Sequence, residues 1–126
     1  SGMIGELENG ISETDFLNLV KERLNVGVLR HSEFLGKPIK KVALCGGSGA
    51  FMIDDAKQCD ADVYLTADVK YHDFFDADNE LLIIDAGHFE TEQFTKQLIA
   101  DIILKKNPKF AVRISSVKTN SVYYFV

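Results

Sequence analysis

Three short aliphatic runs constrain the fold of this chain more than any other feature. They are "IKKVALC" at 39–45, "ADVYLT" at 61–66 and "LLIID" at 81–85, and segments with helical periodicity separate them. Nearly continuous aliphatic strands that alternate with helices are typical of a parallel or mixed sheet covered on both faces. We therefore predict an α/β fold: a three-layer domain with a mixed, largely parallel sheet flanked by helices, formed as one domain by residues 1–126.

The remaining elements follow from periodicity and from capping residues. Ser12 is placed to cap a helix through about Asn25 that buries Phe16, Leu17, Val20 and Leu24. Further elements are expected as a short strand at 26–30, helices at 50–59 and 90–106, a short helix or turn at 68–78, and strands at 109–117 and 121–126 that form a hairpin.

Charge and composition exclude some classes of function. The net charge is −5 and the basic residues are scattered, so no direct nucleic-acid partner is expected. No apolar run approaches the roughly 20 residues that cross a bilayer, so no membrane partner is expected either. The start has no export signal, and Cys45 and Cys59 have no CxxC spacing. We expect reduced thiols and a cytoplasmic location. Ser1 and Gly2, which precede Met3, are either a cloning remnant or part of a longer protein.

Polar clusters follow each of the three aliphatic runs. They are "CGGSG" at 45–49, "TADVKYHD" at 66–73 and "DAGHFETE" at 85–92. In open α/β sheets, ligands bind beyond the carboxyl ends of the strands. The sequence therefore predicts that the three clusters meet at one edge of the sheet and form a site there.

The glycine segment Gly46, Gly47, Ser48 and Gly49 joins a predicted strand to a helix, where backbone N–H groups can hold an anion. It lacks the Lys-Ser/Thr pair of a P-loop. The alternative is a tight turn that needs positive φ.

The second and third clusters each contain a histidine and a carboxylate four residues apart. Asp68 and His72 would share one face of a helical turn near Thr66; the alternative is a capped turn with a solvated histidine. His88 and Glu92 have the same spacing, which suits two ligands of one divalent ion. Their alternative is an exposed surface pair, and two ligands alone do not complete a site.

Two further carboxylates lie close to this pair in the sequence. Asp85 would lie at the end of a strand, and Glu90 would support the helix N-terminus or the ligands.

The sequence from "VALCGGSGAF" through "LTADVKYHDF" to "DAGHFETEQF", together with "SGMIGEL" at the start, resembles the Nif-three-like family (NGG-one-interacting factor three). Its members are also known as GTP cyclohydrolase I type II homologues. They carry a GGSG turn, a Thr-Gly-Asp followed by a Tyr-His pair, and a Gly-His-Tyr/Phe-Glu-Ser/Thr-Glu motif, in this order. Ala67 stands where the family usually has glycine.

The resemblance implies a two-metal site between two similar α/β halves, in proteins that assemble into homo-oligomers. Matched residue by residue, His88 and Glu92 would be metal ligands, while Asp68 and His72 would support the site. The family's other ligands, a His-His pair and an aspartate, come from an N-terminal half that this chain lacks. The chain therefore resembles the C-terminal half of a longer protein.

Two classes of function remain open at this point. The first is part of a metal-dependent hydrolase, either cyclohydrolase-like or phosphoesterase-like, that acts on a nucleotide-like small molecule. Its divalent ions are two per complete site, and zinc, manganese and iron are not distinguished. The second is a non-catalytic binding or regulatory module with a protein partner, in which the metal is structural or incidental.

Overall fold

A computed structural model of the protein describes residues 2–87 and 113–114. Six strands form one sheet in the order β2-β5-β4-β3-β1-β6. Along the chain the elements are β1 (Gly2–Ile11), α1 (Glu13–Leu24), β2 (Arg30–His31), β3 (Ile39–Ser48), the 3-10 helix η1 (Ala50–Met52), α2 (Ile53–Gln58), β4 (Val63–Ala67), the 3-10 helix η2 (Tyr71–Ala77), β5 (Leu82–Asp85) and β6 (Arg113–Ile114).

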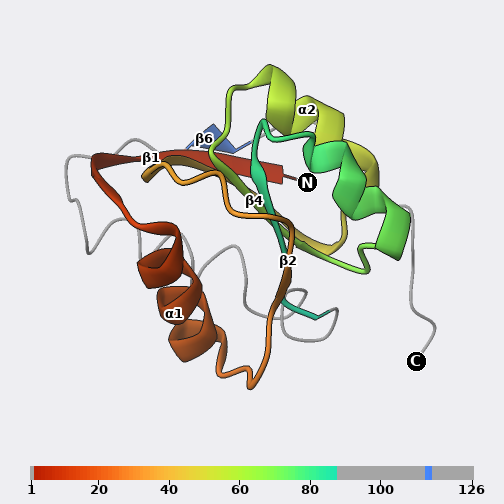
Figure 1. Ribbon diagram of the computed structural model, residues 1–126, viewed down its shortest axis with the longest axis horizontal. Helices are drawn as coiled ribbons and strands as arrows, with labels where there is room; N and C mark the ends of the chain where they lie inside the picture. Colours follow the sequence, from red (N-terminus) through yellow and green to blue (C-terminus); the bar gives the residue numbers. More distant parts are fainter. Residues whose placement is uncertain (1, 88–112, 115–126) are drawn as a thin grey trace.

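The sheet is mixed, with a parallel centre. β3 pairs with β4, and β4 with β5, in parallel; β1 and β2 lie antiparallel to β3 and β5. Helix α1 lies on one side of the sheet and α2 on the other (Figure 1). The predicted three-layer α/β architecture is therefore confirmed for the described residues.

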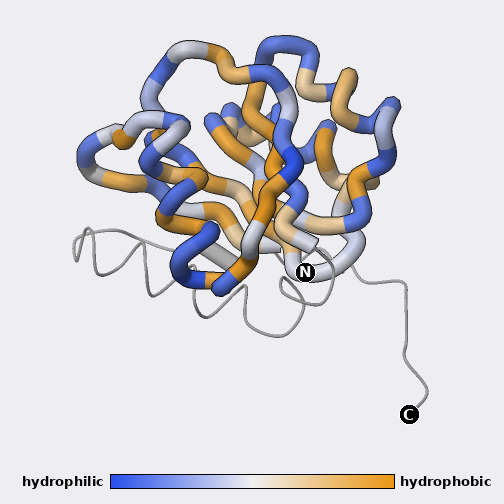
Figure 2. The backbone as a smooth tube through the Cα atoms, turned by 60° about the horizontal axis from the view of Figure 1, so that its bottom comes forward, coloured by the Kyte–Doolittle hydropathy of each residue, from blue (hydrophilic) through white to orange (hydrophobic). Residues whose placement is uncertain are grey.

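Each central strand contributes side chains to two separate cores, because successive residues of a strand point to opposite faces. On the α1 side, Val20 packs with Leu44 and Leu65. On the α2 side, Ile53 packs with Ala43 and Ile83. The strands are mostly hydrophobic, whereas the connecting loops are mostly hydrophilic (Figure 2). This two-sided burial explains why the three aliphatic runs show no simple alternation.

Helix α1 forms as its sequence predicts. The Ser12 side chain accepts a hydrogen bond from the backbone N–H of Asp15, and Asn25 ends the helix in the left-handed conformation. Phe16, Val20 and Leu24 are buried, and Leu17 is partly buried against the same core.

Several elements differ from the prediction. β1 was not predicted at all, and the strand expected at 26–30 is reduced to the two residues Arg30–His31. The glycine segment continues β3 to Ser48 with an irregular register opposite β4, so it is a bulge within the strand rather than a turn after it. Asp68 lies before η2, so the predicted helical turn containing both Asp68 and His72 is wrong.

The C-terminal predictions lie almost entirely outside the described residues. These are the helix at 90–106, the strand at 121–126 and the hairpin. β6 falls within the strand predicted at 109–117 and pairs antiparallel with β1. Within the described ranges, no helix is long and apolar enough to cross a membrane.

Candidate functional site

The carboxyl ends of β3, β4 and β5 meet at one edge of the sheet. Ser48 pairs with Ala67, and Thr66 pairs with Asp85, in the parallel register. The predicted convergence of the first two polar clusters with the start of the third is therefore observed. His88, Glu90 and Glu92 lie outside the described residues, so their roles stay predictions.

Two buried hydroxyl groups on β4 hold the glycine segment. Thr66 donates to the carbonyl of Gly47 at 3.0 Å, and Tyr64 donates to the carbonyl of Gly49 at 2.6 Å. Gly47 has φ of 73°, in the left-handed region that favours glycine. A Cβ on Gly49 would lie 2.4 Å from the Thr66 hydroxyl and 2.6 Å from the Tyr64 hydroxyl. Close contact with β4, together with backbone geometry, explains these two glycines; anion binding by the segment stays a prediction.

Burial also controls the chemistry of Tyr64. Desolvation, with a smaller contribution from the neighbouring Cys45 thiol, raises the pKa of the Tyr64 hydroxyl far above its usual value. Tyr64 is thus a neutral hydrogen-bond donor that fixes the glycine segment. Thr66 is likewise fully buried behind that segment.

Asp68 and His72 line the same hollow although they do not share a helical face. Asp68 has φ of 56° and accepts a hydrogen bond from the Ser48 hydroxyl, which joins the first cluster to the second. His72 lies in η2 with its side chain 75% exposed, and its Nε2 is 3.9 Å from an oxygen of Asp73. The hollow has a volume of about 380 Å³, and Phe51 and Asp76 also line it.

Asp85 is the most strongly held side chain at this edge. One carboxylate oxygen accepts the backbone N–H of Val69 at 2.9 Å and a hydrogen bond from Arg30, and the other accepts the N–H of Gly87 at 2.9 Å. Arg30 also donates to the carbonyl of Val69 at 2.8 Å and lies over the Phe74 ring. Asp85 thereby ties together the end of β5, β2 and the loop after β4.

This arrangement leaves Asp85 a supporting role. Both of its oxygens already accept hydrogen bonds, and its side chain is only 4% exposed. It borders a hollow of about 420 Å³ that Arg30, Asp68 and Gly87 also line. Among residues 2–87 and 113–114, no group of three or more His, Cys, Asp or Glu side chains is placed to hold a metal ion. Metal binding at this edge would therefore need residues beyond those described.

Sequence reasoning missed Arg30 and Tyr64. Asp85, the partner of Arg30, is 55 residues away in the chain, so no pattern of nearby residues could predict the pair. Tyr64 did carry a signal, because a tyrosine inside an otherwise aliphatic buried strand needs a hydrogen-bond partner for its hydroxyl.

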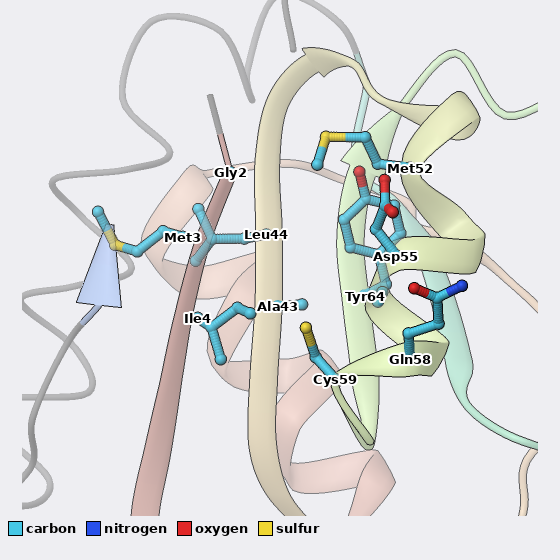
Figure 3. Close-up of a pocket in the computed structure, with 11 residues that line it drawn as sticks. Gly2, Met3, Ile4, Ala43, Leu44, Met52, Asp55, Gln58, Cys59 and Tyr64 are labelled. Carbon is cyan, nitrogen blue, oxygen red and sulfur yellow. The ribbon is translucent and has the colours of Figure 1, made fainter. Parts of the chain in front are cut away.

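A second kind of hollow lies between β1 and β3 on one side and α2 on the other (Figure 3). It has a volume of about 200 Å³, and its walls are largely apolar, including Ile4, Ala43 and Met52. Cys59 lines it with a half-buried side chain, and neither Cys59 nor Cys45 forms a disulfide. Asp55, Gln58 and Tyr64 are the polar side chains that line this hollow.

Comparison with known proteins decides the family. The family model described as Duf34/NIF3 (NGG1p interacting factor 3) matches residues 1–121. The chain belongs to this family. The matched residues include the glycine segment and both histidine motifs, so the resemblance found in the sequence is confirmed.

Among curated members of the NIF3 family, a GTP cyclohydrolase 1 type 2 homolog of Campylobacter jejuni is 38% identical over 120 residues, covering 94% of this chain and 47% of that relative. A protein of the same name from Staphylococcus epidermidis is 32% identical over 127 residues, covering 98% of this chain and 35% of the relative. The chain thus spans less than half the length of these relatives.

Solved structures agree on the NIF3 fold. A Bacillus cereus protein related to NIF3 superposes with a TM-score of 0.67 at 33% identity, covering 97% of this chain and 35% of that one. Reduced HcgD from Methanocaldococcus jannaschii superposes with a TM-score of 0.61 at 27% identity, covering 84% and 42%.

Proposed function

We propose that this chain contributes part of a divalent-metal site to a hydrolase-like protein, with His88 and Glu92 as ligands at the carboxyl end of β5. The observation that carries the proposal is the arrangement at Asp85. Its carboxylate fixes the N–H of Gly87, the residue directly before His88, at 2.9 Å. A backbone that is fixed directly before a ligand restricts where the side chain of that ligand can lie, which favours a preorganised site.

Three further features support this location. The parallel strands β3, β4 and β5 end together, which is where α/β proteins bind ligands. Asp68 and Asp85 border a common hollow there. The curated relatives bear a name that denotes a cyclohydrolase homolog.

The remaining ligands would come from another part of the protein, since this chain spans less than half the length of its relatives. Bound divalent ions would supply Lewis acidity for hydrolysis. Opening of a purine ring and cleavage of a phosphoester both fit that chemistry, so a nucleotide-like small molecule is the proposed substrate class. Assembly into a homo-oligomer and a cytoplasmic location belong to the same proposal.

The test is metal content in the full-length protein, purified without chelator or affinity nickel and measured by plasma mass spectrometry. His88→Ala should remove at least one ion per chain. His31→Ala is the matched control, because His31 is an exposed histidine stacked on Phe34, and that variant should keep its metal. Unchanged metal in His88→Ala would refute the ligand assignment and favour the alternative, a non-catalytic binding or regulatory module.

A further inference from the structure

Three large aromatic side chains are exposed on neighbouring parts of the surface. Phe51 on η1 is 61% exposed, and Tyr71 and Phe75 on η2 are 80% and 69% exposed. The Tyr71 and Phe75 rings pack edge to face with centroids 5.7 Å apart. Phe51 lines a hollow together with His72 and Asp76 of η2. We name Phe51, Tyr71 and Phe75 the aromatic surface. Clustered exposed apolar side chains, unlike single ones, indicate an interaction site.

The charge around the aromatic surface is strongly negative. Four carboxylates, Asp54, Asp68, Asp73 and Asp76, line one hollow beside η2, and Glu33 and Asp78 line another. Lys70 is the one lysine or arginine among the residues that line these two hollows. Within the described part of the chain, Asp76 and Asp78 have no ion pair.

The shape of the surface favours an extended ligand. Phe74, Phe75 and Asp78 line a hollow on one side of η2, and Lys70, His72 and Asp76 line another. A small cation would occupy one hollow at most, and among the described residues no three His, Cys, Asp or Glu side chains are placed together to hold a metal ion. A peptide segment is long enough to cross η2 and contact both.

From this combination we propose that the aromatic surface binds a basic segment of a protein partner. Arginine fits best, because its guanidinium stacks on aromatic rings and pairs with carboxylates in a planar geometry. The guanidinium groups would lie against Tyr71 and Phe75 and pair with Asp76 and Asp78. The complementary charge would also accelerate the encounter at low salt. This proposal does not depend on the metal site.

The test uses a fluorescein-labelled peptide with four arginines separated by alanines, titrated with the full-length protein by fluorescence anisotropy at 0.05 M and 0.3 M salt. The double variant Tyr71→Ser/Phe75→Ser keeps every charge and should weaken binding about 10-fold. Its control is Val28→Ser, which removes an apolar side chain that is 76% exposed outside the aromatic surface and should leave binding unchanged.

A second pair of variants tests the carboxylates. Asp76→Asn/Asp78→Asn should weaken binding about 10-fold at 0.05 M salt and less at 0.3 M, because salt screens exposed charges. Asp15→Asn/Glu22→Gln removes the same charge from exposed positions on α1 and should have a smaller effect.

Two results would overturn the proposal. Equal affinity of Tyr71→Ser/Phe75→Ser and Val28→Ser would mean that charge alone attracts the peptide. The second result has two parts: the unmodified protein does not bind the peptide, and light scattering shows a smaller oligomeric mass for Tyr71→Ser/Phe75→Ser than for the unmodified protein. That result would assign the surface to contact with a second copy of the chain.

Discussion

The two ends of the sheet contain the same local arrangement in different surroundings. At the amino end of β4, Asp62 accepts the backbone N–H groups of Lys40 and Lys41 and lies 3.4 Å from the Lys37 ammonium. At the carboxyl end of β5, Asp85 likewise accepts two backbone N–H groups and pairs with Arg30. The Asp62 side chain is 18% exposed and the Asp85 side chain 4%. Equal numbers of bonded backbone N–H groups therefore predict unequal energies, since a buried donor that loses its acceptor cannot form a hydrogen bond with water instead.

The largest expected effect tests this difference directly. Asp85→Ala should lower the free energy of unfolding by about 3 kcal/mol, because two backbone N–H groups lose a charged acceptor, one of them fully buried. Asp62→Ala should cost about 1 kcal/mol, because water can replace its partly exposed carboxylate. Urea unfolding of both variants measures the pair. Equal losses would show that burial does not distinguish the two ends.

The second prediction concerns the glycine segment, which belongs to the same carboxyl edge. Gly49→Ala should destabilise the protein by about 2 kcal/mol, because its Cβ would overlap two buried hydroxyl groups. Gly27→Ala is the control, since a Cβ there meets nothing within 4 Å. It should stay within about 0.5 kcal/mol of the unmodified protein. Thermal unfolding compares the two, and similar melting temperatures would contradict the tight contact with β4.

The smallest expected effect is also the one that depends on pH. Tyr64→Phe should cost about 1 kcal/mol at neutral pH through the lost hydrogen bond to Gly49. Because burial raises the pKa of Tyr64 in the folded protein, its contribution is present below the unfolded pKa of about 10 and declines as pH rises above that value. The unmodified protein should therefore lose stability faster than Tyr64→Phe between pH 9.5 and 11.

Urea midpoints across that pH range give the measurement. Tyr71→Phe provides the control, since it removes the same hydroxyl group from a side chain that is 80% exposed. If Tyr64→Phe and Tyr71→Phe lost stability in parallel with pH, the Tyr64 hydroxyl would not be held neutral by the fold.

Local signals in the sequence were sufficient for much of the fold. The aliphatic runs predicted β3, β4 and β5, and Ser12 predicted the start of α1. β1 was missed although Met3, Gly5 and Leu7 are buried at alternate positions, because a glycine takes one of the three places and two glutamates interrupt the rest. Its strand conformation depends on pairing with β3, whose paired residues lie 28 to 43 positions further along the chain.

In the site, too, local sequence patterns predicted some features, whereas features that depend on long-range pairing were missed. The order of strands and polar clusters predicted which edge would gather them, because parallel strands must end together. The pairing of Arg30 with Asp85 depends on β2 lying beside β5, which no local pattern encodes. The ligand assignment of His88 and Glu92 remains a prediction from spacing and from family resemblance.

The shortness of β2 has a consequence for how this protein avoids aggregation. Strand β5 is entirely buried and apolar except for Asp85, and among the described residues the segment Arg30 to Ser32 covers its outer edge. Ser32 completes that cover, since its hydroxyl accepts the N–H of Ile83 and its own N–H donates to the carbonyl of Ile83. An uncovered edge of this composition would pair readily with the same strand of another molecule. Two residues of strand and one serine thus occupy the edge of β5 with which another chain could otherwise pair, and the hydrogen bond between Arg30 and Asp85 holds them there.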